Sequence, residues 1–333
     1  MKVKSVSYSS DRKLGRCEQQ YSYRYDEGLK PKLKSKGLFF GDVMHQLQQA
    51  HYRGEGWEKR FKIWKKESWG RLFEEEREMY IENGFNPDFA FELFTHYVDH
   101  WHSEDKHWQI VLVEERFELE TKLGIPVIFQ ADLIVRDKRD GVYALVETKN
   151  NEEIPTAEQR ILAPQVHSYC YLLSKISTNK FPEGIKIGRI IWNYLRTTPV
   201  PKPTLNRDGS ISKRKINTDQ RMYNLFLKEN KIHPKTDDER LGIENVLKNL
   251  PETLSLLRVT NKPNLRVGEM FVRQWLERAR RAKLIKTPLR TWARDCQWMC
   301  DYKLLCEADI LGKDRKTIIH KNFVTKISNA EVN

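Results

Sequence analysis

The segment 130–169 constrains the fold of this 333-residue chain more than any other part of it. It begins with two runs of alternating apolar and polar residues, 130–136 and 143–149, separated by a turn that contains Gly141. Two such runs around a glycine-containing turn predict a β-hairpin. The residues that follow, 155–175, have the spacing of a helix. The segment therefore predicts a hairpin followed by a helix.

Five polar side chains of this segment are expected to meet on one side of the hairpin. Asp132 and Glu147 lie on the two neighbouring strands, and Lys149 shares a face with Glu147 because alternate residues of a strand point the same way. Gln165 and Tyr169 are four residues apart and so look out from one helix face. Two carboxylates beside an ammonium can hold a hard divalent cation and a water. The pattern indicates a metal-dependent phosphodiesterase site.

Two further motifs lie outside this segment. Between residues 38 and 51 apolar residues recur at helical spacing, with Gly41 and His45 among them. A single histidine in such a helix is more often a core residue than a ligand, but the glycine before it and the carboxylates downstream favour a ligand. One cysteine lies near the N-terminus and three lie close together near the C-terminus. They are Cys17, Cys296, Cys300 and Cys306.

Together these motifs resemble the PD-(D/E)XK nuclease superfamily, and specifically the RecB-type nuclease domain. The resemblance is carried by the Gly-x3-His, Asp, Glu-x-Lys and Gln-x3-Tyr motifs in that order along the chain, and it spans nearly the whole chain. The one-plus-three cysteine arrangement is similar to the iron–sulfur branch, which includes AddB-like nucleases and CRISPR-associated exonucleases. The resemblance implies an α/β (α+β) fold with a restriction-endonuclease-like αβββαβ core. It adds a helical insertion and a helical C-terminal region closed by a cysteine-bound cluster.

The resemblance also implies roles for the site residues. The expected metal ligands are His45, Asp132, Glu147 and the backbone carbonyl of Thr148. The ion would be Mg²⁺ or Mn²⁺, and an imidazole ligand shifts the preference toward the softer Mn²⁺. Lys149 would position the attacking water and offset charge on the phosphate. Gln165 and Tyr169 would orient Lys149 or hold the DNA strand.

Three interpretations of the four cysteines remain open: a [4Fe–4S] cluster, a Cys₄ zinc site, and free thiols. Structural zinc usually uses two close cysteine pairs, whereas one isolated cysteine and a group of three fit an iron–sulfur cluster that joins the chain ends. The branch more often has two residues between the first two of the three clustered cysteines, and here Cys296 and Cys300 are separated by three. A fifth cysteine, Cys170, has no place in this pattern and is interpreted as a packing residue.

The composition indicates which kind of molecule the protein binds and in which cellular compartment it works. The chain has 59 Lys and Arg against 46 Asp and Glu, a net charge of +13, which attracts polyanions such as nucleic acid. There is no apolar run long enough to span a membrane. The N-terminal residues lack the apolar region of a signal peptide, and an odd number of cysteines argues against a disulfide framework. We therefore expect a cytoplasmic protein, in the host cytoplasm if a bacteriophage encodes it.

The chain is expected to divide into five parts. They are an N-terminal segment with the first cysteine and the Gly-x3-His helix (1–54), a helical insertion (55–107), the nuclease core (108–196), a basic loop (197–221) and a helical C-terminal region with the cysteine cluster (222–333). In the insertion, aromatic residues at helical spacing predict two or three helices, broken at Asn83-Gly84 and Asn86-Pro87.

Two basic tracts are candidates for DNA contact. One is the loop that contains Lys213, Arg214 and Lys215, for which the alternative is a solvated loop without a partner. The other is the amphipathic helix that contains Arg278 and Arg281. An insertion like this loop is similar to those of bacteriophage members of the group, which favours a bacteriophage source.

The predicted function is that of a metal-dependent DNA exonuclease in recombination, repair or end processing. Its substrate would be single-stranded DNA or duplex ends, and a recombination or single-strand annealing protein is a possible partner. Two alternatives stay open: a structure-specific DNA endonuclease and a non-catalytic DNA-binding protein with a nuclease fold. Loss of function in such a fold typically removes a carboxylate or the lysine, and all of them are present here.

Overall fold

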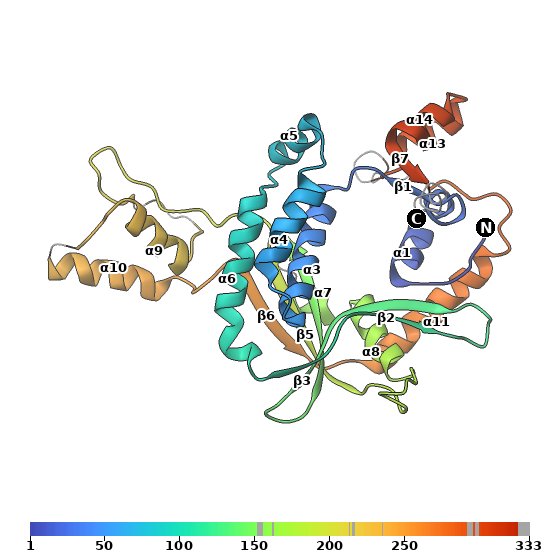
Figure 1. Cartoon of the computed structure of the whole chain (residues 1–333), viewed down its shortest axis with the longest axis horizontal. Coiled ribbons are helices and arrows are strands. Elements are labelled where there is room, and N and C mark those ends of the chain that lie inside the picture. The colour runs from blue at the N-terminus through green and yellow to red at the C-terminus, as the bar shows by residue number, and fades with distance from the viewer. Residues whose placement is uncertain are drawn as a thin grey trace.

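A central β-sheet with helices on both faces forms the body of the computed structural model (Figure 1). The structure describes residues 1–151, 156–161, 163–212, 214, 217–234, 236–291, 296 and 300–325. Among these residues, no helix combines the length and the apolar character needed to cross a membrane.

The sheet has five strands and is mostly antiparallel. They are β2 (Trp108–Leu119), β3 (Val127–Asp137), β4 (Tyr143–Asn151), β5 (Ile187–Arg196) and β6 (Leu256–Asn261), in the spatial order β2-β3-β4-β5-β6. Only β4 and β5 pair in parallel, and a helical connection joins them. This confirms the predicted hairpin and the mixed α/β fold.

One face of the sheet is covered by helix α3 (Lys36–Arg53), with α4 (Trp57–Trp64) and α6 (Pro87–Asp105) packed against it. Buried aromatic residues fill the space between these helices. Helix α5 (Glu74–Glu82) ends before Asn83, and α6 starts at Pro87, where proline is tolerated because the first helical N–H needs no partner. The helices predicted in this segment and both breaks between them are therefore confirmed.

The other face is covered by α8 (Pro164–Leu173), and α11 (Leu265–Ala282) packs on α8. The helix predicted over 155–175 is divided, since α7 (Ala157–Ile161) precedes α8 and Pro164 starts the second helix. Helices α8 and α11 approach closely at Gly268, where a Cβ would lie 2.1 Å from the carbonyl oxygen of His167. The close contact between α11 and α8 therefore depends on the absence of a side chain at residue 268.

Segments from the two ends of the chain form a smaller lobe beside the sheet (Figure 1). Its elements are α1 (Tyr8–Arg16), α2 (Glu18–Tyr21), η1 (Ser22–Asp26), β1 (Leu29–Pro31), α13 (Lys303–Leu311), α14 (Arg315–Asn322) and β7 (Phe323–Thr325). Strands β1 and β7 pair antiparallel, and Tyr23, Leu29, Tyr302 and Phe323 form a small core beneath them. We call this unit the terminal lobe.

The prediction that the chain after residue 221 is helical is wrong at two points. Helices α9 (Gln220–Glu229) and α10 (Asp237–Asn249) are present, but Leu256–Asn261 forms β6 at the edge of the main sheet, and β7 lies near the C-terminus. The sequence of β6, Leu-Leu-Arg-Val-Thr-Asn, is short, and half of its residues are polar. Its strand conformation depends on pairing with β5, about 60 residues earlier, which no local pattern announces.

The close approach of α8 and α11 can be tested with two glycine substitutions. Gly268→Ala is expected to destabilise the protein by roughly 1–3 kcal/mol, because the added methyl group must push the two helices apart. Gly242→Ala in α10 is the matched control: a Cβ there would meet nothing within 4 Å. That change is expected to stabilise α10 by about 0.5–1 kcal/mol, because alanine loses less backbone entropy than glycine. Urea unfolding measures both, and equal free energies of unfolding for the two variants would contradict the packing described.

Candidate active site

The hairpin brings Asp132 and Glu147 opposite each other. Leu133 of β3 pairs with Val146 of β4 in an antiparallel register, so Asp132, before Leu133, lies opposite Glu147, after Val146. The backbone N–H of Thr148 donates to Asp132 Oδ2 at 3.1 Å. Glu147 is 1% exposed, and among the described residues its Oε2 has no hydrogen-bond partner. A buried carboxylate oxygen without a donor is costly, and a bound cation would satisfy it.

Lys149 is held by groups from the hairpin and from α8. Its Nζ donates to Glu147 Oε1 and, at 3.0 Å, to Gln165 Oε1. Gln165 Nε2 in turn donates to the hydroxyl of Tyr169 at 3.4 Å. Because Gln165 and Tyr169 are one helical turn apart, both side chains reach the same edge of the hairpin. The structure thus brings these predicted residues together.

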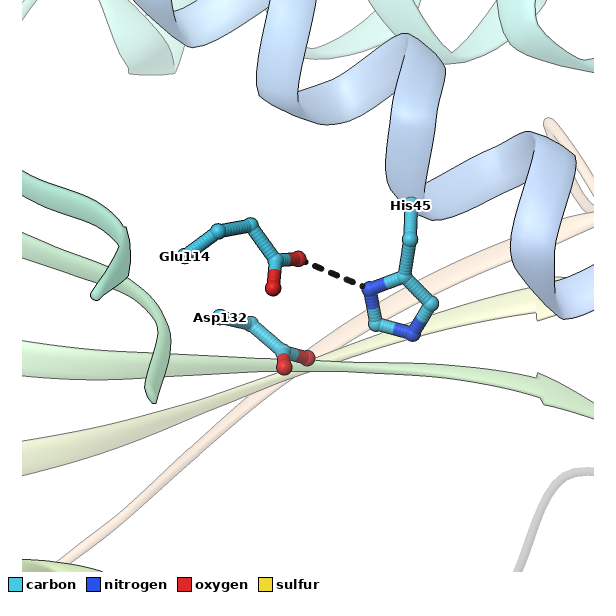
Figure 2. Close-up of side chains that lie close together, drawn as sticks. All are labelled: His45, Glu114 and Asp132. Carbon is cyan, nitrogen blue, oxygen red and sulfur yellow. Dashed lines mark hydrogen bonds and ion pairs between the residues drawn. The ribbon is translucent and has the colours of Figure 1, made fainter. Parts of the chain in front are cut away.

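His45 reaches the site from the opposite face, on helix α3. Its Nδ1 lies 3.1 Å from Glu114 Oε1 (Figure 2). Gly41 is one turn earlier, and a Cβ at that position would meet no described atom within 4 Å. The glycine therefore leaves open space beside His45 rather than allowing a close packing contact.

Glu114 is a site residue that the sequence analysis missed. Its neighbours Val113 and Glu115 on β2 pair with Leu133 and Ala131, which places Glu114 opposite Asp132. It has a positive φ of 52°, a conformation that residues other than glycine rarely adopt. Gln130 Nε2 donates to its Oε2 at 2.7 Å. Its position depends on the register of β2 against the hairpin, which no local pattern in the sequence shows.

The crowding of acidic groups changes their protonation. Burial raises the pKa of Asp132, and the neighbouring Glu147 carboxylate raises it further, to about 7. Burial lowers the pKa of His45, but the hydrogen bond to Glu114 and the Asp132 carboxylate outweigh this effect and raise the pKa to about 9. Binding of a divalent cation among these groups would displace such protons.

The donor set fits a divalent cation. Ligand atoms of His45, Glu114 and Asp132 all lie within 4.8 Å of one another, and no other such group occurs among the described residues (Figure 2). With Glu147, three carboxylates from three adjacent strands and one imidazole surround the same buried region. Carboxylate oxygens suit Mg²⁺ or Mn²⁺, and the imidazole favours Mn²⁺.

The four cysteines predicted to bind a cluster all lie near the terminal lobe, half-buried and without a disulfide. Gln20 Nε2 lies 4.0 Å from Cys300 Sγ, and Cys17 Sγ lies 3.9 Å from the carbonyl oxygen of Leu289. Burial raises the pKa of the Cys300 thiol, and the nearby thiols of Cys296 and Cys17 raise it further. Cys306 packs against the small core of the lobe together with Cys300.

The basic residues predicted to contact DNA differ in what the structure shows of them. Lys213 and Lys215 fall outside the described residues, and Arg214 is exposed. Arg278 is engaged within the protein, since its Nη1 donates to Asp11 Oδ2 at 2.7 Å. Arg281 is exposed and pairs with Glu277 on its own helix at 2.8 Å. Their contact with DNA stays a prediction.

A mixed sheet with Asp132 and Glu147-x-Lys149 on adjacent strands has the architecture of a nuclease core. The sequence matches the PD-(D/E)XK nuclease superfamily over residues 5–307, and the chain therefore belongs to that superfamily. No curated protein matches it. Among solved structures it is similar to a crystal structure described as a "Putative exonuclease" from Eubacterium rectale, with 14% identity and a TM-score of 0.43. That match covers 88% of this chain and 86% of the other.

The contact between Glu114 and His45 has a measurable consequence. Metal-binding histidines usually give their second ring nitrogen to a carboxylate, and loss of that partner costs about 10–100-fold in metal affinity. Glu114→Ala is expected to weaken Mn²⁺ binding by roughly that factor. Glu114→Gln should bind within a few-fold of wild type, because the amide oxygen can still accept from Nδ1.

The control is Glu118→Ala, an exposed change on the same strand that should leave Mn²⁺ binding unaltered. Calorimetric titration of the three variants distinguishes the roles. Equal loss of affinity in the Ala and Gln variants would contradict a positioning role and make Glu114 a direct ligand.

Proposed function

We propose that this nuclease-superfamily member is a divalent-metal-dependent deoxyribonuclease that acts as an exonuclease. The observation that carries the proposal is the unsatisfied Oε2 of buried Glu147, at a point where carboxylates of three adjacent strands and Lys149 converge. Such a set of groups destabilises an empty site and suits a cation and a phosphate.

The proposed roles follow from the contacts. Asp132, Glu147, the Thr148 carbonyl and His45 would hold Mg²⁺ or Mn²⁺, with Glu114 orienting His45. When bound, the cation supplies a water of lowered pKa and neutralises charge on the phosphate. The water would lose one proton to solvent as its oxygen forms a bond to phosphorus. The bond from phosphorus to the leaving sugar oxygen would break, and that oxygen would take up one proton from solvent.

The chain's own residues orient this reaction. The Lys149 ammonium, fixed by Glu147 and Gln165, has one N–H left to orient the water, and its charge offsets charge on the phosphate. Tyr169 steadies Gln165 and so keeps Lys149 in one orientation. Burial lowers the pKa of Lys149, but the Glu147 carboxylate outweighs this effect and raises it, so the ammonium remains charged. The proposed role of Lys149 is therefore electrostatic and orienting, not that of a general base.

The retention of every charged group of the motif favours catalysis over a purely DNA-binding role. Action on DNA ends in recombination, repair or end processing extends this proposal, and the structure-specific endonuclease is the alternative that the same residues serve. A bacteriophage source and a recombination partner stay predictions from the sequence.

We further propose that Cys17, Cys296, Cys300 and Cys306 bind a [4Fe–4S] cluster. The support for this proposal is that half-buried thiols from both ends of the chain come together: Cys300 lies near Cys17 and Cys296, and Cys306 packs on the same small core as Cys300. The proposed role is structural: the cluster would close a loop of nearly the whole chain.

The catalytic proposal predicts loss of cleavage without loss of fold. Glu147→Gln and Lys149→Ala should each lower cleavage of end-labelled linear DNA by about 10²-fold or more, because each removes a group that stabilises charge in the transition state. Far-ultraviolet circular dichroism and DNA affinity without metal should remain near wild type. Wild-type cleavage rates in the Glu147 variant would exclude this site.

The form of the substrate decides between the two nuclease classes. Wild-type protein with Mn²⁺ is expected to degrade linear DNA and to leave covalently closed circles intact. Glu115→Ala, an exposed change near the site, serves as the control and should cleave normally. Cleavage of closed circles at the linear rate would favour the endonuclease.

The cluster proposal predicts a coloured protein. Anaerobic purification should give a brown product with broad absorbance near ~400 nm and about four irons per chain. Cys300→Ser should bleach the colour and lower stability. The control is Cys170→Ser, because Cys170 is buried in the main core and not among the four thiols. Metal analysis that finds stoichiometric zinc and no iron would contradict the cluster and indicate a zinc site.

A further inference from the structure

The terminal lobe carries a basic groove, and none of the described residues that line it is acidic. The groove has a volume of about 430 Å³ and lies between the end of β1 and the pair α14 and β7. Its lining residues are Lys32, Lys316, Ile319, His320, Phe323, Val324 and Thr325. The floor is apolar, whereas Lys32, Lys316 and His320 are exposed at the rim. A rim of cations over an apolar floor is suited to phosphates and unpaired bases together.

The groove continues into a lysine-rich segment that leads toward the candidate active site. Lysines recur at every second position from Lys30 to Lys36, and Lys30, Lys32 and Lys34 are exposed. Lys36 is the first residue of α3, the helix that carries His45 nine residues later. At about 1.5 Å per helical residue, that distance is roughly 14 Å. Figure 1 shows this segment running from the terminal lobe to the start of α3.

This segment is held at both ends, so its lysines have a defined position. The backbone N–H of Lys32 donates to the carbonyl of Asn322 at 2.9 Å, and Lys32 Nζ donates to the carbonyl of His320 at 2.7 Å. The hydroxyl of Tyr80 donates to the carbonyl of Lys34 at 2.6 Å. Lys34 also pairs with Asp42 at 3.2 Å, which leaves Lys30, Lys32 and Lys316 as the cations best placed to meet a ligand.

We propose that the groove between β1, β7 and α14, with the lysines of residues 30–34, binds the phosphate backbone of a single nucleic-acid strand that extends toward the sheet. The inference rests on the proposed nuclease function, because it assigns a second contact to the strand whose end reaches Asp132. The apolar floor and the small volume fit the unpaired bases of one strand and not the charged outside of a duplex.

The test is equilibrium binding of a fluorescent single-stranded oligonucleotide in EDTA, where no cleavage occurs. The variant Lys30→Ala/Lys316→Ala removes two exposed cations and leaves the bonds of Lys32 in place. Each phosphate contact on a single strand contributes about 0.7 to the slope of log affinity against log salt, so the slope should fall by roughly 1.4. Between about 50 and about 200 mM salt, wild type should then lose roughly sevenfold more affinity than the variant.

The matched control is Lys59→Ala/Lys62→Ala, which removes the same charge from exposed positions on α4. The effect should also depend on strand length: a strand of about 20 nucleotides should distinguish the groove variant from wild type, whereas one of about four should bind both equally. An unchanged slope, an equal loss in the control, or an equal loss on blunt closed duplex DNA would overturn the proposal.

This experiment is independent of the proposed chemistry. Cleavage of a short oligonucleotide at saturation should be unaltered in the groove variant, because neither lysine belongs to the site around Asp132. If wild type cleaves no DNA but the groove variant loses length-dependent binding, the groove proposal is supported and the nuclease proposal is contradicted. If cleavage is normal and the salt slope is unchanged in the variant, the nuclease proposal is supported and the groove proposal is contradicted.

Discussion

The repulsion among three carboxylates that lie close together is the main constraint on this structure. Glu114, Asp132 and Glu147 come from neighbouring strands, and ligand atoms of Glu114 and Asp132 lie within 4.8 Å of each other. Two unit charges no further apart than that repel by at least roughly 3 kcal/mol at an effective dielectric constant near 20. Lys149 and His45 offset part of this repulsion, and the raised pKa of Asp132 offsets more by retaining a proton near neutral pH. The surrounding helices hold these groups together against that repulsion.

A buried arginine on the same sheet is satisfied by groups of the protein itself, in contrast to Glu147. Arg258 of β6 is 4% exposed, yet its Nη1 pairs with Asp105 at 2.6 Å. Its guanidinium also lies between the rings of Trp101 and Trp108, at 4.1 and 4.5 Å from their centroids. Such stacking and pairing satisfy the cation within the protein. Glu147 differs because one of its buried oxygens has no partner among the described residues, and the difference supports a ligand there.

The sequence predicted the residues whose positions depend on local periodicity. Alternation along the hairpin placed Glu147 and Lys149 together, and the helical period placed Gln165 beside them. Glu114 was missed because its approach depends on a positive φ and on the register of a third strand. Strand β6 was missed because its conformation comes from pairing with a strand far away in sequence. Periodicity likewise cannot show that Cys17 comes near Cys300, because that contact joins opposite ends of the chain.

The meeting of the chain ends links the cysteines to the basic groove. The lobe's own core is small, formed by Tyr23, Leu29, Tyr302, Leu305 and Phe323. A cross-link between Cys17 and residues about 280 positions later would remove roughly 5–6 kcal/mol of loop entropy from the unfolded chain by the estimate used for disulfides. That restraint acts on the terminal lobe, whereas the strands around Asp132 are held by a larger core, to which Leu14 and Tyr21 of the lobe also contribute. Loss of a cluster would therefore disturb the groove that binds the nucleic-acid strand before it disturbed the residues around Asp132.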